Sequence, residues 1–158
     1  MVKKTINEIE GKVNNVRIEV KIQEEEIEYR NTGRKIGATF VGYKLESGGM
    51  TIYVNIYDPE WVEEGPLLFA LAHEVGHAIY RADQEIRYNF GCNSYNNSYK
   101  MPGEMWEYVV ENYGPESWDE ELFADGFASW ITGITRWGSD VKKPGVVPGI
   151  EGLEKWIK

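Results

Sequence analysis

The stretch His73-Glu74-Val75-Gly76-His77 contains both histidines of this 158-residue chain. Side chains four residues apart lie on one face of a helix, so both imidazoles can point toward one metal ion. Glu74, beside the first histidine, can reach a water bound to that metal and act as its general base. The spacing therefore predicts the metal-binding helix of a zinc-dependent hydrolase. The alternative is a chance pair of surface histidines on a solvated helix.

The residues around this stretch predict a buried helix that begins near Gly65-Pro66, since proline is favoured in the first helical turn. Apolar residues occupy almost every face of the helix: Leu67, Leu68, Phe69, Leu71, Val75 and Ile79. Such a helix is buried, and its polar side chains then need partners. His73, Glu74 and His77 are the polar exceptions, and a metal with its bound water would satisfy all three.

The composition indicates one folded domain spanning residues 1–158. The chain is 42% hydrophobic and 13% aromatic, which supplies material for a hydrophobic core and argues against disorder. Its net charge of −9 disfavours nucleic acid as a partner, because polyphosphate would be repelled. The N-terminal residues lack the apolar run of a signal peptide, and no apolar run reaches the roughly 18 residues of a membrane span. We therefore expect a cytoplasmic protein with no membrane partner.

Cys92 is the only cysteine of the chain. An internal disulfide is impossible, which suits a reducing cytoplasm. The thiol is either an inert, partly buried side chain or a fourth zinc ligand that would block the site.

Three segments before the metal-binding helix have the period-two pattern of strands with one buried face. They are residues 16–29, 36–45 and 50–57. Ser47-Gly48-Gly49 joins the last two as a hairpin, and the acidic run Glu24-Glu25-Glu26 interrupts the first. These segments predict a small antiparallel sheet packed on the metal-binding helix, in an α+β fold.

The remaining elements are predicted from caps and periodicity. Residues 5–8 have the spacing of a capping box and predict a short helix that ends near residue 11. Residues 83–101 show little periodicity and predict a long loop, whereas residues 102–113 predict a helix. A last long helix is predicted over residues 117–137.

A catalytic zinc site usually takes three protein ligands and a water, so one ligand is missing. No histidine remains, and Glu121 is the best candidate because it shares one helical face with Asp125, among apolar residues that should face the core. In this interpretation Glu121 binds zinc, and Asp125 accepts a hydrogen bond from the free ring nitrogen of a liganding histidine. Alternatively, both acids lie on a wet face near the helix N-terminus, where acidic residues are favourable anyway.

Other carboxylates compete with Glu121 for the third position. Glu120 is the closest competitor, but its spacing from Ser117 is that of a capping box, which would occupy the Glu120 side chain. Glu107 and Glu111 share a helical face that we interpret as the solvated side of their helix. We therefore rank Glu121 first and predict one zinc ion per chain.

The two motifs together, residues 73–77 and Glu121-Leu122-Phe123-Ala124-Asp125-Gly126-Phe127-Ala128, resemble the gluzincin class of metallopeptidases and, more narrowly, the ImmA/IrrE family. Those proteins carry a His-Glu-x-x-His helix and a later Glu-x-x-Ala-Asn/Asp-x-Phe-Ala helix, and small archaeal minigluzincins are a second comparison. The resemblance implies a zincin-like metallopeptidase fold, with the two histidines and Glu121 as zinc ligands and Glu74 as the base. It also implies a protein or peptide substrate, such as a transcriptional regulator, because family members often cleave a repressor.

Zincins often border the substrate cleft with the strand that precedes the metal-binding helix. We therefore predict that residues 50–57 pair with extended substrate, with Thr51, Tyr53 and Asn55 as binding residues.

The predicted function is zinc-dependent hydrolysis of peptide bonds. The group that stabilises the oxyanion beside the metal stays open: a tyrosine such as Tyr88, Tyr95 or Tyr99, an arginine, a lysine or a backbone N–H. The alternative function is that of a latent or non-catalytic zinc-binding protein, a regulator or antirepressor-like interaction partner. The presence of Glu74 argues against this alternative, because a purely structural zinc needs no base.

Overall fold

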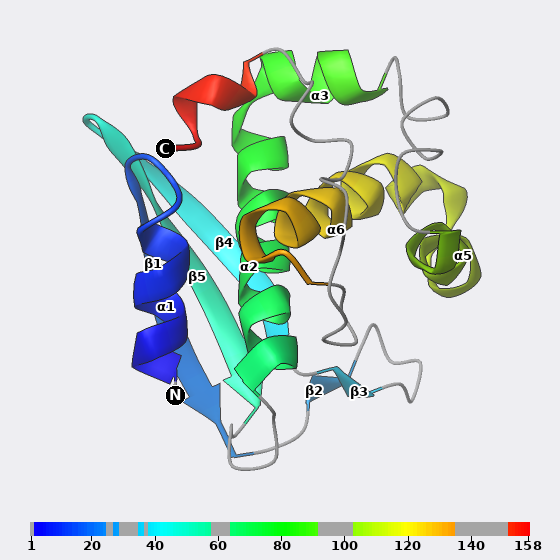
Figure 1. Cartoon of the computed structure of the whole chain (residues 1–158), viewed down its shortest axis with the longest axis horizontal. Coiled ribbons are helices and arrows are strands. Elements are labelled where there is room, and N and C mark those ends of the chain that lie inside the picture. Colours follow the sequence, from blue (N-terminus) through cyan, green and yellow to red (C-terminus); the bar gives the residue numbers. More distant parts are fainter. Residues whose placement is uncertain are drawn as a thin grey trace.

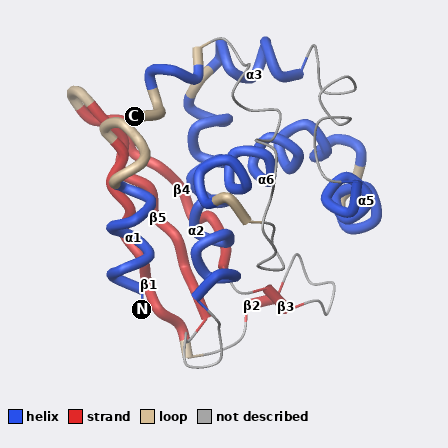
Figure 2. Tube along the Cα trace, viewed as in Figure 1, coloured by secondary structure: helices blue, strands red, loops and turns tan. Residues whose placement is uncertain are grey.

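The structure, a computed structural model, describes residues 2–24, 27–28, 35–36, 38–57, 64–91, 103–134 and 152–158. Its α-helices are α1 (Val2–Glu10), α2 (Glu64–Ala82), α3 (Gln84–Gly91), α5 (Gly103–Asn112) and α6 (Trp118–Thr132). Its strands are β1 (Val16–Gln23), β2 (Ile27–Glu28), β3 (Lys35–Ile36), β4 (Ala38–Glu46) and β5 (Gly49–Tyr57). Two short 3-10 helices, η2 (Pro115–Ser117) and η4 (Leu153–Lys155), complete the described elements. The predicted α+β class is confirmed (Figures 1 and 2).

The main sheet has the strand order β1-β5-β4, with β5 in the centre. The hairpin of β4 and β5 is antiparallel as predicted, and Gly48 supplies the positive φ of its turn. β1 pairs with β5 in parallel, so the predicted all-antiparallel sheet is wrong and the sheet is mixed. The hairpin signal fixes only the β4–β5 pair, whereas the place of β1 depends on contacts between segments far apart in the sequence.

The first predicted strand is also shorter than residues 16–29. β1 ends at Gln23, and Ile27–Glu28 form a separate two-residue strand that pairs with β3. Glu24 forms a bend after β1, and the rest of the acidic run lies outside the described residues.

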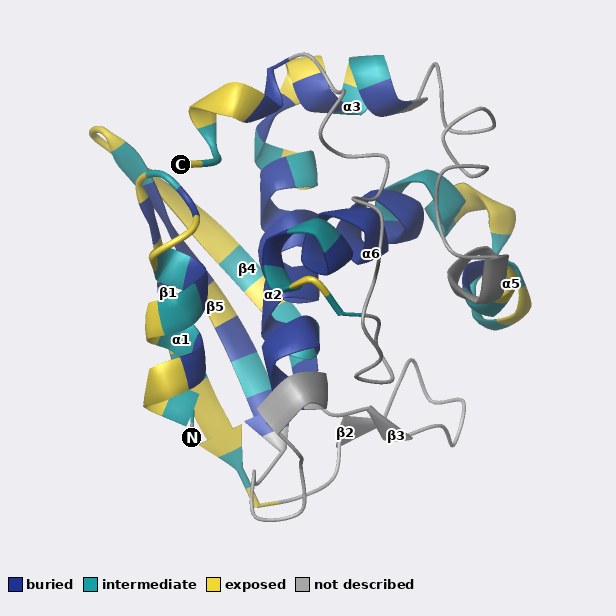
Figure 3. Ribbon diagram, in the orientation of Figure 1, coloured by how far each residue is buried: buried dark blue, intermediate teal, exposed yellow. Residues whose placement is uncertain are grey.

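One face of the sheet forms the core with the helices. Ile52, Val54 and Ile56 of β5 are buried on this face, where α1 and α2 pack (Figures 1 and 3). Because side chains alternate along a strand, Thr51, Tyr53 and Asn55 point to the opposite face. Helix α2 therefore lies between the sheet and α6.

Helices α2 and α6 pack against each other over a long contact in which both are buried (Figure 3). Gly76 lies where the two helices come close together, since a Cβ atom built there would lie 2.9 Å from the Cα of Ala124. Real carbon contacts are about 3.5–4.0 Å, so only glycine fits at this point. The residue between the two histidines thus sets how closely the two helices approach.

Helix α6 ends earlier than predicted, at Thr132 instead of about Trp137. Gly133 adopts a left-handed conformation with φ 75° and donates its N–H to the carbonyl of Ser129, a standard helix stop. Helix α1 begins at Val2, earlier than the predicted start at residue 5, and ends at Glu10 as expected.

Helix α3 lies where the sequence predicted the first part of a long loop. The Asp83 carboxylate accepts a hydrogen bond from the Ile86 N–H at 3.2 Å, which caps the helix, and Ile86 and Phe90 are fully buried. This cap and the four-residue apolar spacing are short signals that a search for periodicity over a long window misses. Residues 92–101 lie outside the described part, and the predicted helix 102–113 is confirmed as α5.

The C-terminal segment 152–158 packs against the segment between α1 and β1. Ile157 forms an antiparallel bridge with Val13, and the Trp156 indole donates to the Asp83 carboxylate at 2.7 Å. Lys155 pairs with the same carboxylate at 2.8 Å. Among the described residues, no helix combines the length and apolar character needed to cross a membrane.

Candidate metal centre

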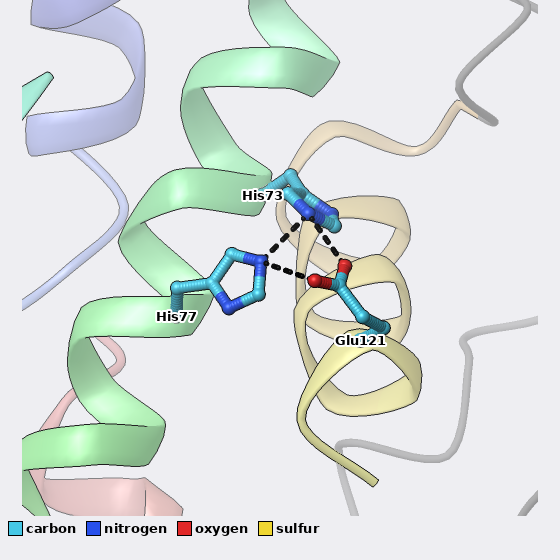
Figure 4. A group of neighbouring side chains, drawn as sticks. All are labelled: His73, His77 and Glu121. Atoms are coloured by element: carbon cyan, nitrogen blue, oxygen red, sulfur yellow. Dashed lines mark hydrogen bonds and ion pairs between the residues drawn. The ribbon is translucent and has the colours of Figure 1, made fainter. Parts of the chain in front are cut away.

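Helices α2 and α6 bring His73, His77 and Glu121 together at their contact (Figure 4). The Nε2 atoms of the two histidines are 2.9 Å apart. The Glu121 carboxylate lies 3.2 Å from His73 Nε2 and 3.3 Å from His77 Nε2. All three residues are buried, each at most 7% exposed. This buried group could bind a metal ion.

A carboxylate fixes each imidazole from its far side. Asp125 lies 2.6 Å from His73 Nδ1, and Glu120 lies 2.9 Å from His77 Nδ1. An ionised carboxylate can only accept hydrogen bonds, so in the hydrogen-bonded pair of His77 and Glu120 the Nδ1 atom is the donor. The 2.6 Å contact with Asp125 favours the same tautomer of His73. In the neutral form of each ring, Nε2 is then a free lone pair that points toward Glu121.

When both rings are neutral, this arrangement gathers acceptors with no donor among them. The two Nε2 lone pairs of His73 and His77 and the carboxylate of Glu121 converge on one point, which favours a cation there. With metal–ligand bonds of about 2.0–2.1 Å, a tetrahedral zinc site has ligand atoms about 3.3 Å apart. Two of the three distances lie within about 0.1 Å of that value, and the third, between the two histidine nitrogens, is shorter at 2.9 Å, so the three donors could hold a metal ion such as zinc.

The carboxylates around the two histidines also favour a positive charge at this site. Burial by itself would lower the pKa of His73, but Asp125 and Glu121 outweigh it and raise the pKa to about 10. Burial acts likewise on His77, where Glu120 and Glu121 raise the pKa to about 9. The site therefore attracts positive charge strongly, either protons or a metal ion.

Glu74 follows His73 on α2 and is also buried, with 7% of its surface exposed. Burial raises the pKa of its carboxyl group, although the positive charges of both histidines oppose the shift. Since its pKa responds to His73, His77 and Glu121, this carboxyl group lies within electrostatic reach of the site.

Glu120 does not have the role that the sequence predicted. Ser117 is the N-cap of α6, yet its side chain makes no capping hydrogen bond, so the proposed capping box does not form. The Glu120 carboxylate instead holds His77 and accepts two hydrogen bonds from Arg81, at 2.9 and 3.0 Å. The interactions with His77 and Arg81 hold the pKa of Glu120 at about 2, although burial alone would raise it.

The predicted substrate residues Thr51, Tyr53 and Asn55 are not at the metal centre. They lie on β5, whose backbone is paired with β1 on one side and β4 on the other. No edge of β5 is free for an extended substrate, so the prediction that this strand pairs with substrate is wrong. The sequence pattern identified the strand but not its place in the sheet.

Other candidates from the sequence are distributed as follows. Tyr88 is 71% exposed on α3, and Glu107 and Glu111 are exposed on α5. Cys92, Tyr95 and Tyr99 lie outside the described residues.

The sequence analysis missed two residues near His77, Phe40 and Arg81. Phe40 of β4 stacks near His77 with its ring centre 6.5 Å away, and the Arg81 guanidinium lies 5.1 Å from the Phe40 ring centre. Arg81 is four residues after His77, so its position on the same helical face could have been read from the sequence. The hydrogen bonds from Arg81 to Glu120 could not be read from the sequence.

Protein-family models, curated proteins and solved structures were all compared with this chain, and none of them matches it.

Proposed function

We propose that this protein is a zinc-dependent peptidase with His73, His77 and Glu121 as zinc ligands. The observation that supports the proposal is the convergence of two imidazoles and a carboxylate at near-tetrahedral spacing, with a buried glutamate beside them. A purely structural zinc site has no use for Glu74, which makes no part of the three-ligand set. The proposal includes a zincin-like fold of the gluzincin type, resembling the ImmA/IrrE family.

We assign each residue a role in peptide hydrolysis from its position in the site. A bound Zn²⁺ would lower the pKa of a coordinated water toward about 7 and polarise the carbonyl of the scissile bond. Glu74 would accept a proton from the attacking water and pass it to the leaving amine. Burial raises the pKa of Glu74, which brings this carboxylate closer to the working range of a base near neutral pH. Asp125 would keep His73 in the tautomer that presents Nε2 to the metal.

The substrate we propose is an extended peptide or protein segment, such as part of a transcriptional regulator. Within the described sheet, β4 is an edge strand, and its Phe40 lies beside His77. β4 is therefore a better support for an extended peptide than the central strand β5.

The first experiment compares zinc content and peptide cleavage in the wild type, Glu74→Gln and Glu121→Ala. The matched control is Glu107→Gln, which changes an exposed glutamate of α5. Cleavage is followed by mass spectrometry on a diverse peptide library, because a peptidase with one target can ignore a generic protein substrate. We expect about one zinc per chain in the wild type and Glu74→Gln, and a sharp loss in Glu121→Ala.

Zinc content and peptide cleavage, measured together, distinguish the possible functions. Cleavage that requires both Glu74 and zinc supports the peptidase. Zinc binding without cleavage of any library peptide favours the non-catalytic regulator, and cleavage that survives in Glu74→Gln removes the proposed base. A wild type that binds no zinc when zinc is supplied overturns the proposal.

A further inference from the structure

The two histidines of the metal centre are held by carboxylates of different character. Asp125, the partner of His73, is completely buried, and its burial restricts its short side chain. Glu120, the partner of His77, has a longer side chain that is 21% exposed. An exposed glutamate loses more conformational freedom when it is fixed, and it can also bond to water. Glu120 therefore needs a further contact to hold His77 as firmly as Asp125 holds His73.

Arg81 supplies that contact. Its Nε lies 2.9 Å from Glu120 Oε1 and its Nη2 lies 3.0 Å from Oε2, so the guanidinium binds both oxygens as a fork. A bidentate pair of this kind fixes the direction of the carboxylate as well as its position. The Oε2 atom that receives one arm of the fork also accepts the hydrogen bond from His77 Nδ1.

Arg81 is itself placed by two elements. It lies one helical turn after His77 on α2, which directs both side chains toward the start of α6. Its guanidinium also lies over the ring of Phe40 on β4, at 5.1 Å, which is a cation–π distance. The arginine is thus held between the sheet and the carboxylate, although its side chain is 49% exposed.

We propose that Glu120 and Arg81 act as one positioning pair for His77, in which the fork from Arg81 fixes the Glu120 carboxylate and the carboxylate fixes the imidazole. The proposal rests on the proposed function, because it assumes that His77 is a zinc ligand. Neither residue touches the metal or the substrate in this scheme. Each acts through His77, by setting its tautomer and the direction of its Nε2 lone pair.

The test uses Glu120→Gln, Arg81→Gln and the double variant in the full chain. Zinc affinity is measured by competition with a chelator, and the geometry of the site by the visible absorption spectrum of the Co²⁺-substituted protein. Partners of this kind typically contribute about 10–100-fold in metal affinity, so we expect that loss in each single variant, with a changed cobalt spectrum. Because the two residues act in series, the double variant should bind zinc about as tightly as the weaker single variant.

Two further variants separate positioning from charge and from general stability. Arg81→Lys keeps the positive charge but cannot form the fork, so its zinc affinity should fall between those of the wild type and Arg81→Gln. Arg17→Gln removes a single-contact arginine–glutamate pair from the surface, between Arg17 and Glu19 at 3.2 Å, and should leave zinc affinity and the cobalt spectrum unchanged. Thermal unfolding of each variant without zinc shows whether it folds.

The outcomes distinguish this proposal from the function on which it rests. If the wild type binds no zinc, the proposed function fails. If the wild type binds zinc and the losses in the two single variants add up in the double variant, the residues act separately and the pair is refuted. Full affinity in Arg81→Lys would overturn the role of the fork, and wild-type affinity in both Gln variants would overturn the positioning role altogether.

Discussion

The substitution Gly76→Ala tests whether the close approach of α2 and α6 is necessary for metal binding. It adds one methyl group between the two histidines without changing any ligand. The new Cβ would lie 2.9 Å from the Cα of Ala124 and 3.3 Å from the Cβ of Phe127. Relief of the first contact needs a shift of about 0.6 Å, since carbon atoms pack at about 3.5–4.0 Å. The contact is with backbone, so the helices themselves have to move apart.

Two opposing effects determine how much Gly76→Ala changes the zinc affinity. Alanine is favoured over glycine in a helix interior by about 0.8–1.0 kcal/mol, whether or not metal is bound. Overpacking costs about 1–3 kcal/mol, and the protein without metal can relax part of it by separating the helices. Metal–ligand bond lengths vary by only about 0.2 Å, so the metal-bound form has less freedom to relax in this way. Only the part of the overpacking cost that the metal-free protein relieves is subtracted from the free energy of zinc binding, which corresponds to a loss of affinity of up to about 150-fold.

The assay is chelator competition for zinc, together with thermal unfolding in the presence and absence of zinc. Gly76→Ala should unfold close to the wild-type temperature without zinc, and should gain less stability when zinc is added. The matched control is Gly42→Ala, because a Cβ at Gly42 would meet no atom within 4 Å. If Gly76→Ala binds zinc within about twofold of the wild type, the argument that helix separation controls this site is wrong.

Three further predictions concern the rest of the fold and the site. Asp125→Asn leaves its histidine partner with a neutral acceptor and should weaken zinc binding about 10–100-fold in the same chelator assay; unchanged affinity would contradict its role. Phe90→Ala removes a fully buried ring and should lower the free energy of unfolding in urea by about 3–5 kcal/mol, whereas a loss below about 1 kcal/mol would mean that α3 does not pack as described. Burial alone would raise the pKa of Asp83, but hydrogen bonding and the Lys155 ammonium outweigh it and hold the pKa below its usual range. Because the pKa is lower in the folded state, Asp83 stabilises the fold above about pH 4 and this contribution is lost as the pH falls through the folded-state pKa. The stability difference between the wild type and Asp83→Asn, followed by urea unfolding, should therefore be constant from about pH 7 to 5 and shrink below about pH 4; a difference that grows in acid would refute the assignment.

The parts of the site that could be predicted are those that depend on one helix at a time. The four-residue spacing of His73 and His77, and of Glu121 and Asp125, places each pair on one face because the helical period is a local property of the backbone. The structure brings three of these residues together and sets Asp125 behind His73. Their role in binding zinc stays a prediction.

The local rules also produced the errors. Ser117 and Glu120 have the spacing of a capping box, but Glu120 is taken by His77 and Arg81, whose charges attract its carboxylate more strongly than a backbone N–H would. A sequence shows which bond is possible nearby, but not which distant partner competes for the same group.

The sequence by itself determined the α+β class, the hairpin of β4 and β5, the helix that carries His73 and His77, and the pairing of acids along α6. Only the tertiary structure decided that β1 runs parallel to a central β5, that β4 instead forms the edge beside His77, and that Arg81 reaches Glu120. The physical reason is the range of the interactions. Helical and strand periods follow from the geometry of neighbouring residues, whereas strand order and contacts between helices depend on how buried surfaces from distant segments fit together.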